Sequence, residues 1–347
     1  MKTTTKILAL ICALLMLFTS VALVSCDISS NNDEETSSST SENDAPTLDK
    51  SLPINISVLN GTTGFGIAKL IDDNNNGKAT LRYRFFVESD ASNITAALIN
   101  GSVDIAALPT NAAANLYNKT KGKVQIAAIN TLGVLYLVTN NVEINSMEDL
   151  KGKTVYCPAQ NPAFIFSALC SANGLTPATD VTIDTSFAQP ADLRTAVAAG
   201  QVDIAVLPEP MVTIAKSANA NLKIALDLTE VWESVYGENS LAQGCIVVRT
   251  EWAKAHPAEL AKFLEEYKAS IEYVVANPKE ASEMIISTGV FAGKAPVAEK
   301  AIPNCNIVYI DGEDMKSALD TFFSKLFAVA PASVGGEIPD DGIYYKK

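Results

Sequence analysis

The chain has 347 residues, of which 48% are hydrophobic, and its formal net charge at pH 7 is −13. This length is sufficient for two domains of ordinary size. The acidic balance disfavours nucleic acid as a partner, because nucleic-acid binding requires a basic face, and it equally disfavours adsorption to anionic lipid by charge. It is typical of a monomer with a soluble outer surface.

The N-terminus has the features of a secretory signal. Two lysines precede the apolar run Ile7–Phe18, which is shorter than the ~20 residues of a membrane span. The run leads to Leu23–Cys26, whose sequence Leu-Val-Ser-Cys resembles the bacterial lipobox, in which the cysteine receives diacylglycerol. We therefore predict a lipoprotein signal peptide over residues 1–25 and lipidation at Cys26. An ordinary signal with an incidental cysteine is the alternative.

Residues 26–50 are rich in Ser, Asn, Thr, Asp and Glu and have almost no large apolar side chains. Such a segment cannot bury enough surface to offset its ordering entropy. We expect a lipidated, disordered tether that holds the folded part at the extracytoplasmic face of the cell membrane.

Strands and helices alternate along the rest of the chain, which favours an α/β architecture. In the first half, strands are predicted at 54–59, 81–88, 103–108, 124–130 and 134–139, and helices at 67–71, 92–100 and 111–118. In the second half, strands are predicted at 154–157, 181–184, 202–207, 223–227 and 243–248, and helices at 146–152, 163–172, 191–199 and 211–217. Helices alone follow, at 258–276, 279–287, 295–301 and 312–328.

Two of these helices carry local signals. Ser146 is the expected N-cap of helix 146–152, with Asp149 at the position that a capping box assigns to Glu or Gln. Helix 258–276 has apolar side chains on one side only, which indicates packing against a core. Its apolar positions are Leu260, Phe263, Leu264, Tyr267, Ile271 and Val274/Val275.

The segment Gly101–Pro109 recurs as Gly200–Pro208, an offset of 99 residues (200 minus 101). The glycine, Val-Asp-Ile-Ala and Leu-Pro are identical in both copies, and each copy follows a helix-like run. A helix–glycine–strand unit used twice predicts two similar α/β lobes. Two such lobes leave a cleft between them, which is where we expect a ligand.

Loops that follow strands hold the first candidate contacts, because ligands of parallel sheets sit beyond the carboxyl ends of the strands. Gly61–Gly64 offers free N–H groups and two hydroxyls at a helix start, so we predict ligand contacts at Thr62, Thr63 and Gly64. The loop matches neither a P-loop nor a dinucleotide fingerprint. An ordinary turn with a helix cap is the alternative.

The residues after the two Leu-Pro copies should face the same cleft. Asn111 and Glu209 are therefore predicted ligand contacts, with helix capping as the alternative. Gln160, Asn161 and Ala163 open a helix of the second half, where the two amides can donate and accept hydrogen bonds. The loops contain no Lys or Arg, which argues against a small, strongly hydrated anion such as nitrate. Aromatic contacts could come from Phe65, Phe164 or Phe187, for each of which a core position is the alternative.

The sequence offers few candidate residues for nucleophilic catalysis or for metal binding. The only histidine, His256, precedes Pro257 at a predicted helix start, far along the chain from the cleft loops. The cysteines beyond Cys26 form no C-x-x-C pair and lack a nearby histidine, so we predict no zinc site. They are Cys157, Cys170, Cys245 and Cys305. We expect buried thiols, with disulfide pairing left open, and we predict no catalytic residue, metal or cofactor.

In several motifs the chain resembles the solute-binding proteins of ABC importers, in the nitrate/sulfonate/taurine and thiamine-precursor group. The motifs are the lipobox, the two Gly-x-Val-Asp-Ile-Ala copies, Asp149–Val155, Glu251–Leu260 and the tail segments 301–305 and 335–345. The resemblance covers residues 53 to 347.

The resemblance implies a two-lobe, type II periplasmic-binding-protein-like α/β fold with two hinge crossovers, expected near Leu135–Thr139 and Gly244–Arg249. Lobe one would comprise 51–137 and 248–347, and lobe two 138–247. Thr131 and Gly133 beside the first hinge, and Gln243 beside the second, would join the ligand contacts. The implied partners are a small polar or aromatic organic solute and the permease subunits, which would recognise the closed lobes.

Two departures limit what the resemblance carries. The cleft loops lack the basic residues expected of a sulfonate or nitrate clamp, and the cysteine-rich segment and histidine of the related pyrimidine-forming enzymes are missing. We therefore expect a receptor without enzymatic activity. The alternatives are an enzyme of the same fold acting on a menaquinone- or thiamine-precursor-like compound, or an extracellular sensor domain.

Overall fold

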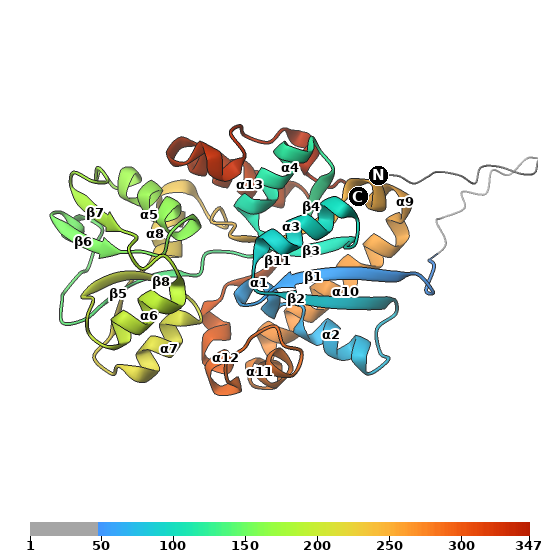
Figure 1. Ribbon diagram of the computed structural model, residues 1–347, viewed down its shortest axis with the longest axis horizontal. Helices are drawn as coiled ribbons and strands as arrows, with labels where there is room; N and C mark the ends of the chain where they lie inside the picture. The colour runs from blue at the N-terminus through green and yellow to red at the C-terminus, as the bar shows by residue number, and fades with distance from the viewer. Residues whose placement is uncertain (1–47) are drawn as a thin grey trace, which may run out of the picture. The chain divides into compact units, whose positions relative to one another are not determined.

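Two separate β-sheets organise the chain in the computed structural model, which describes residues 48–347 (Figure 1). The signal peptide, Cys26 and almost all of the predicted tether lie outside the described residues. The first sheet has six strands in the order β11 (Ile307–Ile310), β4 (Val124–Thr131), β10 (Gly244–Arg249), β3 (Ile105–Pro109), β1 (Pro53–Leu59) and β2 (Arg82–Glu88). The second has five, in the order β7 (Val181–Asp184), β6 (Lys153–Tyr156), β8 (Ile204–Pro208), β5 (Leu135–Thr139) and β9 (Lys223–Asp227).

The two sheets have equivalent topology, and the sequence repeat lies at equivalent positions in them. β3 pairs in parallel with β1 and antiparallel with β10, while β8 pairs in parallel with β6 and antiparallel with β5. The register matches too, since Pro109 lies opposite Gly244 and Pro208 lies opposite Leu135. In each sheet, the strand that the chain forms directly after it crosses from the other sheet runs antiparallel to both of its neighbours. This strand is β5 in the second sheet and β10 in the first.

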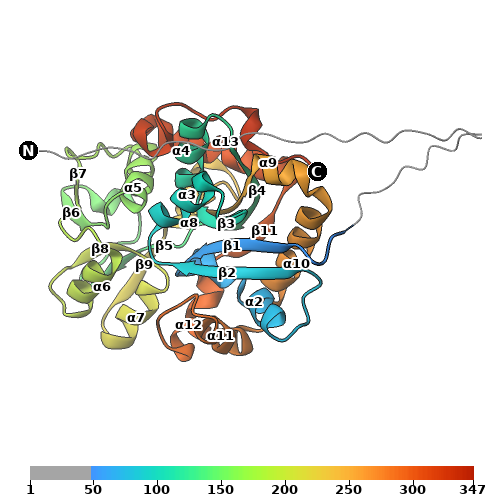
Figure 2. The ribbon, with the colours of Figure 1, turned by 45° about the vertical axis from the view of Figure 1, so that its right-hand side comes forward.

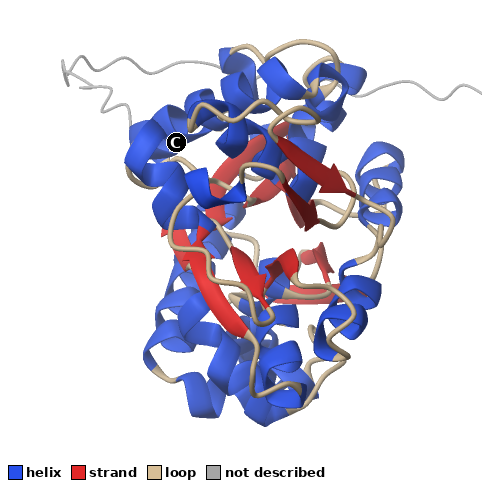
Figure 3. Ribbon diagram, turned by 90° about the vertical axis from the view of Figure 1, so that its left-hand side faces the viewer, coloured by secondary structure: helices blue, strands red, loops and turns tan. Residues whose placement is uncertain are grey.

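Helices flank the strands of both sheets (Figure 3). We call the part built on the first sheet lobe one and the part built on the second sheet lobe two. The helices of lobe one are α1 (Thr62–Phe65), α2 (Ala68–Asn75), α3 (Ala91–Asn100), α4 (Thr110–Thr120), α9 (Thr250–Ala255), α10 (Pro257–Ala276), α11 (Pro278–Ser287), α12 (Ala295–Ala301) and α13 (Gly312–Val329). Those of lobe two are α5 (Asn161–Ala172), α6 (Pro190–Ala198), α7 (Met211–Ala218) and α8 (Leu228–Tyr236). Short 3₁₀ turns form η1 (Glu148–Leu150), η2 (Ile302–Asn304), η3 (Pro331–Val334) and η4 (Asp341–Ile343).

The apolar stripe predicted on helix 258–276 is confirmed on α10. All of its predicted positions from Leu260 to Val274 are buried in a cluster beneath the first sheet, whereas Val275 is 48% exposed. A second cluster contains side chains of both lobes, including Trp232 of α8 and Phe322 of α13, whose ring centroids lie 6.1 Å apart. α13 also packs against α5 (Figure 2). Apolar burial therefore joins the lobes along one side, and residues 48–347 belong to one compact unit.

The structure differs locally from the predicted elements at several places. The segment predicted as helix 146–152 contains only the turn η1, and Ser146 is not its cap. Instead, the Asp149 carboxylate accepts hydrogen bonds from the backbone N–H groups of Asn145 and Ser146, at 2.8 and 3.0 Å. α8 was not predicted, since it is rich in aromatic and β-branched residues; capping by Asp227 and burial of Trp232 stabilise it. β11 was not predicted either.

The chain crosses between the sheets at two places. The first crossing is 132–134, between β4 and β5, and the second is 237–243, between α8 and β10. β5 lies wholly in the second sheet and β10 wholly in the first. The chain therefore passes from one sheet to the other a few residues before each of the lobe limits expected at 137 and 247. The exact lobe and hinge limits stay predictions. No helix within residues 48–347 is both long and apolar enough to cross a membrane.

Candidate functional site

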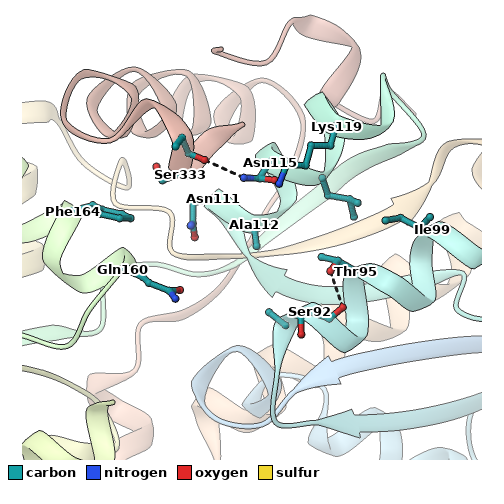
Figure 4. Close-up of a pocket in the computed structure, with 13 residues that line it drawn as sticks. Ser92, Thr95, Ile99, Asn111, Ala112, Asn115, Lys119, Gln160, Phe164 and Ser333 are labelled. Atoms are coloured by element: carbon teal, nitrogen blue, oxygen red, sulfur yellow. Dashed lines mark hydrogen bonds between the residues drawn. The ribbon is translucent and has the colours of Figure 1, made fainter. Parts of the chain in front are cut away.

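A cavity of about 570 Å³ lies between the two lobes (Figure 4). Gln160 and Phe164 of lobe two extend toward Asn111 and Ser333 on the opposite wall. The full lining comprises Ala91, Ser92, Thr95 and Ile99 of α3, Asn111, Ala112, Asn115, Leu116 and Lys119 of α4, Gln160 and Phe164, and Ala332 and Ser333 of η3. Most of this surface is apolar, with a few amides and hydroxyls among the apolar side chains, which is the composition of a site for a small organic molecule.

Three helices begin at this cavity. Ala91 and Ser92 open α3, Asn111 and Ala112 lie in the first turn of α4, and Gln160 directly precedes α5. None of the three helices has an acidic residue in its first turn. The Asp90 carboxylate nevertheless caps α3, because it accepts a hydrogen bond from the Ser92 N–H at 2.8 Å, whereas α4 and α5 have no side-chain cap. The positive ends of the α4 and α5 dipoles therefore favour an electron-rich or anionic group in the cavity.

Two residues of the lining have a buried polar atom that makes no hydrogen bond within residues 48–347, namely the Asn111 Oδ1 and the Ser333 Oγ. The Asn161 Oδ1 is also buried and without a partner in these residues, but Asn161 is not in the lining. A buried polar atom without a partner costs about 1–3 kcal/mol. The Asn111 Oδ1 and the Ser333 Oγ are therefore positioned to form hydrogen bonds with a molecule that enters the cavity.

The loop before α5 has a strained backbone at the cavity. Gln160 has φ 65°, in the left-handed region that disfavours residues with a Cβ atom. This conformation directs its side chain into the cavity, where it is one of the two lining residues from lobe two. Strain of this kind concentrates at binding sites, where the surrounding structure holds it in place.

Of the predicted contacts, the structure thus places Asn111 and Gln160 on opposite walls of one cavity, whereas Asn161, the next residue after Gln160, is not in the lining. Phe164, one of three aromatic candidates, also lines it. Phe65 is fully buried and packs edge-on against Phe291, and Phe187 packs on Tyr156. Phe65 therefore occupies a core position, whereas Phe187 is partly buried at the edge of a lobe-two cluster, and neither ring is in the lining.

Glu209 lies elsewhere and caps a helix. Its carboxylate accepts hydrogen bonds from the Thr213 backbone N–H, at 3.1 Å, and from the Thr213 hydroxyl, at 2.9 Å. The side chain is 97% buried, and burial raises the pKa of its carboxyl above the usual value. It borders a smaller cavity of about 300 Å³ that it shares with Lys216, Lys300 and Asn304.

Thr131, Gly133 and Gln243 bind the two crossings together. The Gln243 Oε1 accepts a hydrogen bond from the Val134 N–H at 2.8 Å, and the Gln243 N–H donates to the Thr131 carbonyl at 3.0 Å. A Cβ atom at Gly133 would lie 2.5 Å from the Leu241 Cδ2. None of the three is in the cavity lining, so the contacts that they make in this structure are within the protein.

Thr62, Thr63, Gly64 and Ala163 also lie outside the lining. The Thr63 carbonyl accepts a hydrogen bond from the Asn130 Nδ2 at 3.0 Å, and Gly64 is buried, where a Cβ would lie 2.7 Å from the Leu59 carbonyl oxygen. Ala163 packs against the cluster shared by both lobes. Their predicted ligand contacts stay predictions.

Sequence reasoning missed Lys119 and Ser333. Lys119 lies in the last turn of α4 and is the one charged residue of the lining, and Ser333 follows a helix near the end of the chain. Neither belongs to a loop after a strand. Asn111, Asn115 and Lys119 are four residues apart in turn and therefore share one face of α4, and this helical spacing is the signal that could have found Lys119.

The described residues offer little for covalent or metal chemistry. Within residues 48–347 no group of three or more His, Cys, Asp or Glu side chains could hold a metal ion. His256 lies beside Glu259 at the start of α10, outside the cavity lining. The predicted burial of the thiols is confirmed, because Cys157, Cys170, Cys245 and Cys305 are all free and buried.

Comparisons with solved structures define the class of fold. The crystal structure of an ABC transporter from Parabacteroides distasonis is 28% identical, covers 85% of this chain and 99% of that chain, and superposes with a TM-score of 0.71. The periplasmic aliphatic sulphonate binding protein SsuA from Escherichia coli is 14% identical over 85% of this chain and 92% of its own, with a TM-score of 0.68. The alkanesulfonate-binding protein SsuA from Xanthomonas axonopodis pv. citri, bound to MOPS, is 14% identical over 85% of this chain and 96% of its own, with a TM-score of 0.59. The chain has the two-lobe, type II fold of periplasmic binding proteins.

The family model described as NMT1/THI5 like matches residues 82–281. The chain belongs to this family, as the resemblance predicted. Comparison with curated proteins gave no match.

Proposed function

We propose that the protein is a lipid-anchored solute-binding receptor of an ABC importer, which captures a small polar or aromatic organic solute between its lobes and delivers it to the permease. The single observation that carries this proposal is the cavity in which Asn111 of lobe one faces Gln160 and Phe164 of lobe two. A solute that touches both walls contacts the closed state better than the open one, and therefore closes the lobes.

Binding without chemistry is supported by the composition of the cavity. The lining contains serine and threonine hydroxyls and Lys119, but no carboxylate or histidine that could act as a general base for a hydroxyl, and no cysteine. Family membership and the related binding proteins support a transport role, and the lipobox at Leu23–Cys26 supports an anchor at the extracytoplasmic face of the membrane.

Thermal unfolding of the full chain, purified in a mild detergent, tests the proposal. The probes are taurine, thymine, glutamine and riboflavin, one for each solute class that the cavity could hold. A compound that binds the folded state at 100 times its Kd stabilises it by about 2.7 kcal/mol, which raises the melting temperature. Failure of every probe to shift the melting temperature would contradict the proposal.

Variants on the two walls localise the binding. Asn111→Ala and Gln160→Ala should each weaken binding of the active probe about tenfold or more, because each removes an amide that faces the solute. Gln201→Ala is the matched control, since Gln201 is exposed and lies outside the cavity. Equal losses in all three variants would point to an effect unrelated to this cavity.

A further inference from the structure

The segment after α13 forms a third wall of the interlobe cavity. Ala332 and Ser333, both in η3, line the cavity together with α3, α4 and the start of α5 (Figure 4). This segment is distant in sequence from the other walls and follows no strand. Its position in the cavity therefore depends on the contacts that hold it there.

Hydrogen bonds from α4 fix this wall. The Asn115 Nδ2 donates to the Ala332 carbonyl at 3.1 Å, and the Asn118 Nδ2 donates to the carbonyls of Val334 and Glu337, both at 2.8 Å. Gly335 has φ 93°, and a Cβ there would lie 3.2 Å from the Asn115 Cα, so the backbone passes close to the helix. The helix that presents Asn111 to the cavity thus also holds η3 in place.

Ser333 has a polar atom that this network leaves unused. Its Oγ atom is buried and has no hydrogen-bond partner among residues 48–347. The network engages the main chain on both sides of Ser333 but not its hydroxyl. Because a hydroxyl can donate and accept, a polar group in the cavity can satisfy it whether that group is a donor or an acceptor.

We infer that Ser333 is a solute contact and a determinant of specificity, and that its hydroxyl forms a hydrogen bond with a polar group of the bound solute. This inference rests on the proposed receptor function and deepens it. Asn111 and Ser333, from different segments of lobe one, then contact the solute opposite Gln160 and Phe164 of lobe two.

The test uses the full chain in mild detergent and the same four probes, taurine, thymine, glutamine and riboflavin. Ser333→Ala should weaken binding of the active probe about 2- to 10-fold, the value of one hydrogen bond between neutral groups. It should leave the melting temperature of the unliganded protein unchanged, since the Oγ has no partner to lose. Ser333→Leu, which fills part of the cavity, should weaken binding more strongly.

Ser324→Ala is the matched control. Ser324 is also half-buried, lies on the neighbouring α13, and donates only to the Thr321 carbonyl of its own helix. The control should bind the probe as the wild type does. Wild-type affinity in both Ser333 variants would overturn the inference and leave the receptor function standing. A wild-type protein that binds none of the probes would overturn the receptor function, and the inference with it.

Discussion

Tyr136 and Asn304 connect the two lobes by a direct hydrogen bond. The Tyr136 hydroxyl, on β5 of lobe two, donates to the Asn304 carbonyl, in η2 of lobe one, at 2.9 Å. Both residues lie outside the cavity lining. The bond therefore favours the present arrangement of the lobes, which the proposed receptor function identifies as the closed state, without contacting a solute in the cavity.

We predict that Tyr136→Phe shifts the lobes toward the open state and weakens solute binding about 2- to 10-fold, because the closed state loses one hydrogen bond. The separation of the lobes can be measured by the distance between spin labels on cysteines introduced at the exposed residues Ser102 and Ser171. The buried native thiols should not take up label. An unchanged distance distribution together with unchanged affinity would contradict the prediction.

Gly133 on the first crossing has no room for a side chain. Its Cβ would approach the Thr229 Oγ1 and lie 2.5 Å from the Leu241 Cδ2. We expect Gly133→Ala to lower the free energy of unfolding by about 1–3 kcal/mol through overpacking, measured by urea denaturation. Adding Thr229→Ala should restore part of this loss, since it removes the nearest atom, a hydroxyl that makes no hydrogen bond within the described part of the chain. A double variant as unstable as the sum of the two single variants would exclude this clash as the cause.

The repeat provides a matched pair of aspartates. Asp104 is buried, pairs with Arg249 at 2.9 Å, and accepts a hydrogen bond from the Asn55 N–H at 3.0 Å. Asp203, at the same position of the second copy, is exposed. Asp104→Ala should lower the free energy of unfolding by about 2–4 kcal/mol, because it leaves Arg249 and Asn55 without their partner, whereas Asp203→Ala should cost less than about 0.5 kcal/mol. Similar losses in chemical denaturation would show that the two copies are equivalent in energy as well as in fold.

Glu209 should make stability depend on pH. Burial raises the pKa of its carboxyl, and hydrogen bonds from Thr213 oppose this only in part. The folded state then binds the proton more tightly than the unfolded state. Its contribution to stability is therefore present below the unfolded pKa of about 4.3 and is lost as the pH rises through the raised folded pKa.

We predict that Glu209→Gln, which keeps an acceptor for Thr213, gains free energy of unfolding relative to the wild type as the pH rises through this interval. The gain should stay constant above the raised pKa, where the Glu209 carboxyl of the wild type is ionised in both the folded and the unfolded state. Denaturation at a series of pH values measures it, with Glu238→Gln as the exposed control. A difference between Glu209→Gln and wild type that is independent of pH would contradict the prediction.

We expect the four buried cysteine thiols to be unreactive in the folded protein. Burial raises the pKa of Cys170 and of Cys245 to about 12, and also raises the pKa values of Cys157 and Cys305. Thiolates are the reactive form, so we expect no reaction with Ellman's reagent at pH 8 in native buffer and reaction of all four after denaturation. Fast labelling of any of them in native buffer would show that it is accessible.

Local sequence patterns determined the α/β class, most of the elements and the doubled architecture. The apolar stripe of α10 and the offset between Gly101–Pro109 and Gly200–Pro208 are properties of neighbouring residues, and burial of apolar surface enforces both in the fold. The Leu-Pro ends also pointed to Asn111, because a helix begins directly after the first of them.

Only the tertiary structure decided which residues meet. Asn111, Gln160 and Ser333 share a cavity although more than 200 residues separate the first from the last, because hydrogen bonds from Asn115 and Asn118 draw the end of the chain onto α4. The repeat suggested equal roles for Asn111 and Glu209, yet Glu209 turns back onto Thr213 and caps α7. Long-range packing and hydrogen bonding, which local patterns do not encode, make that choice.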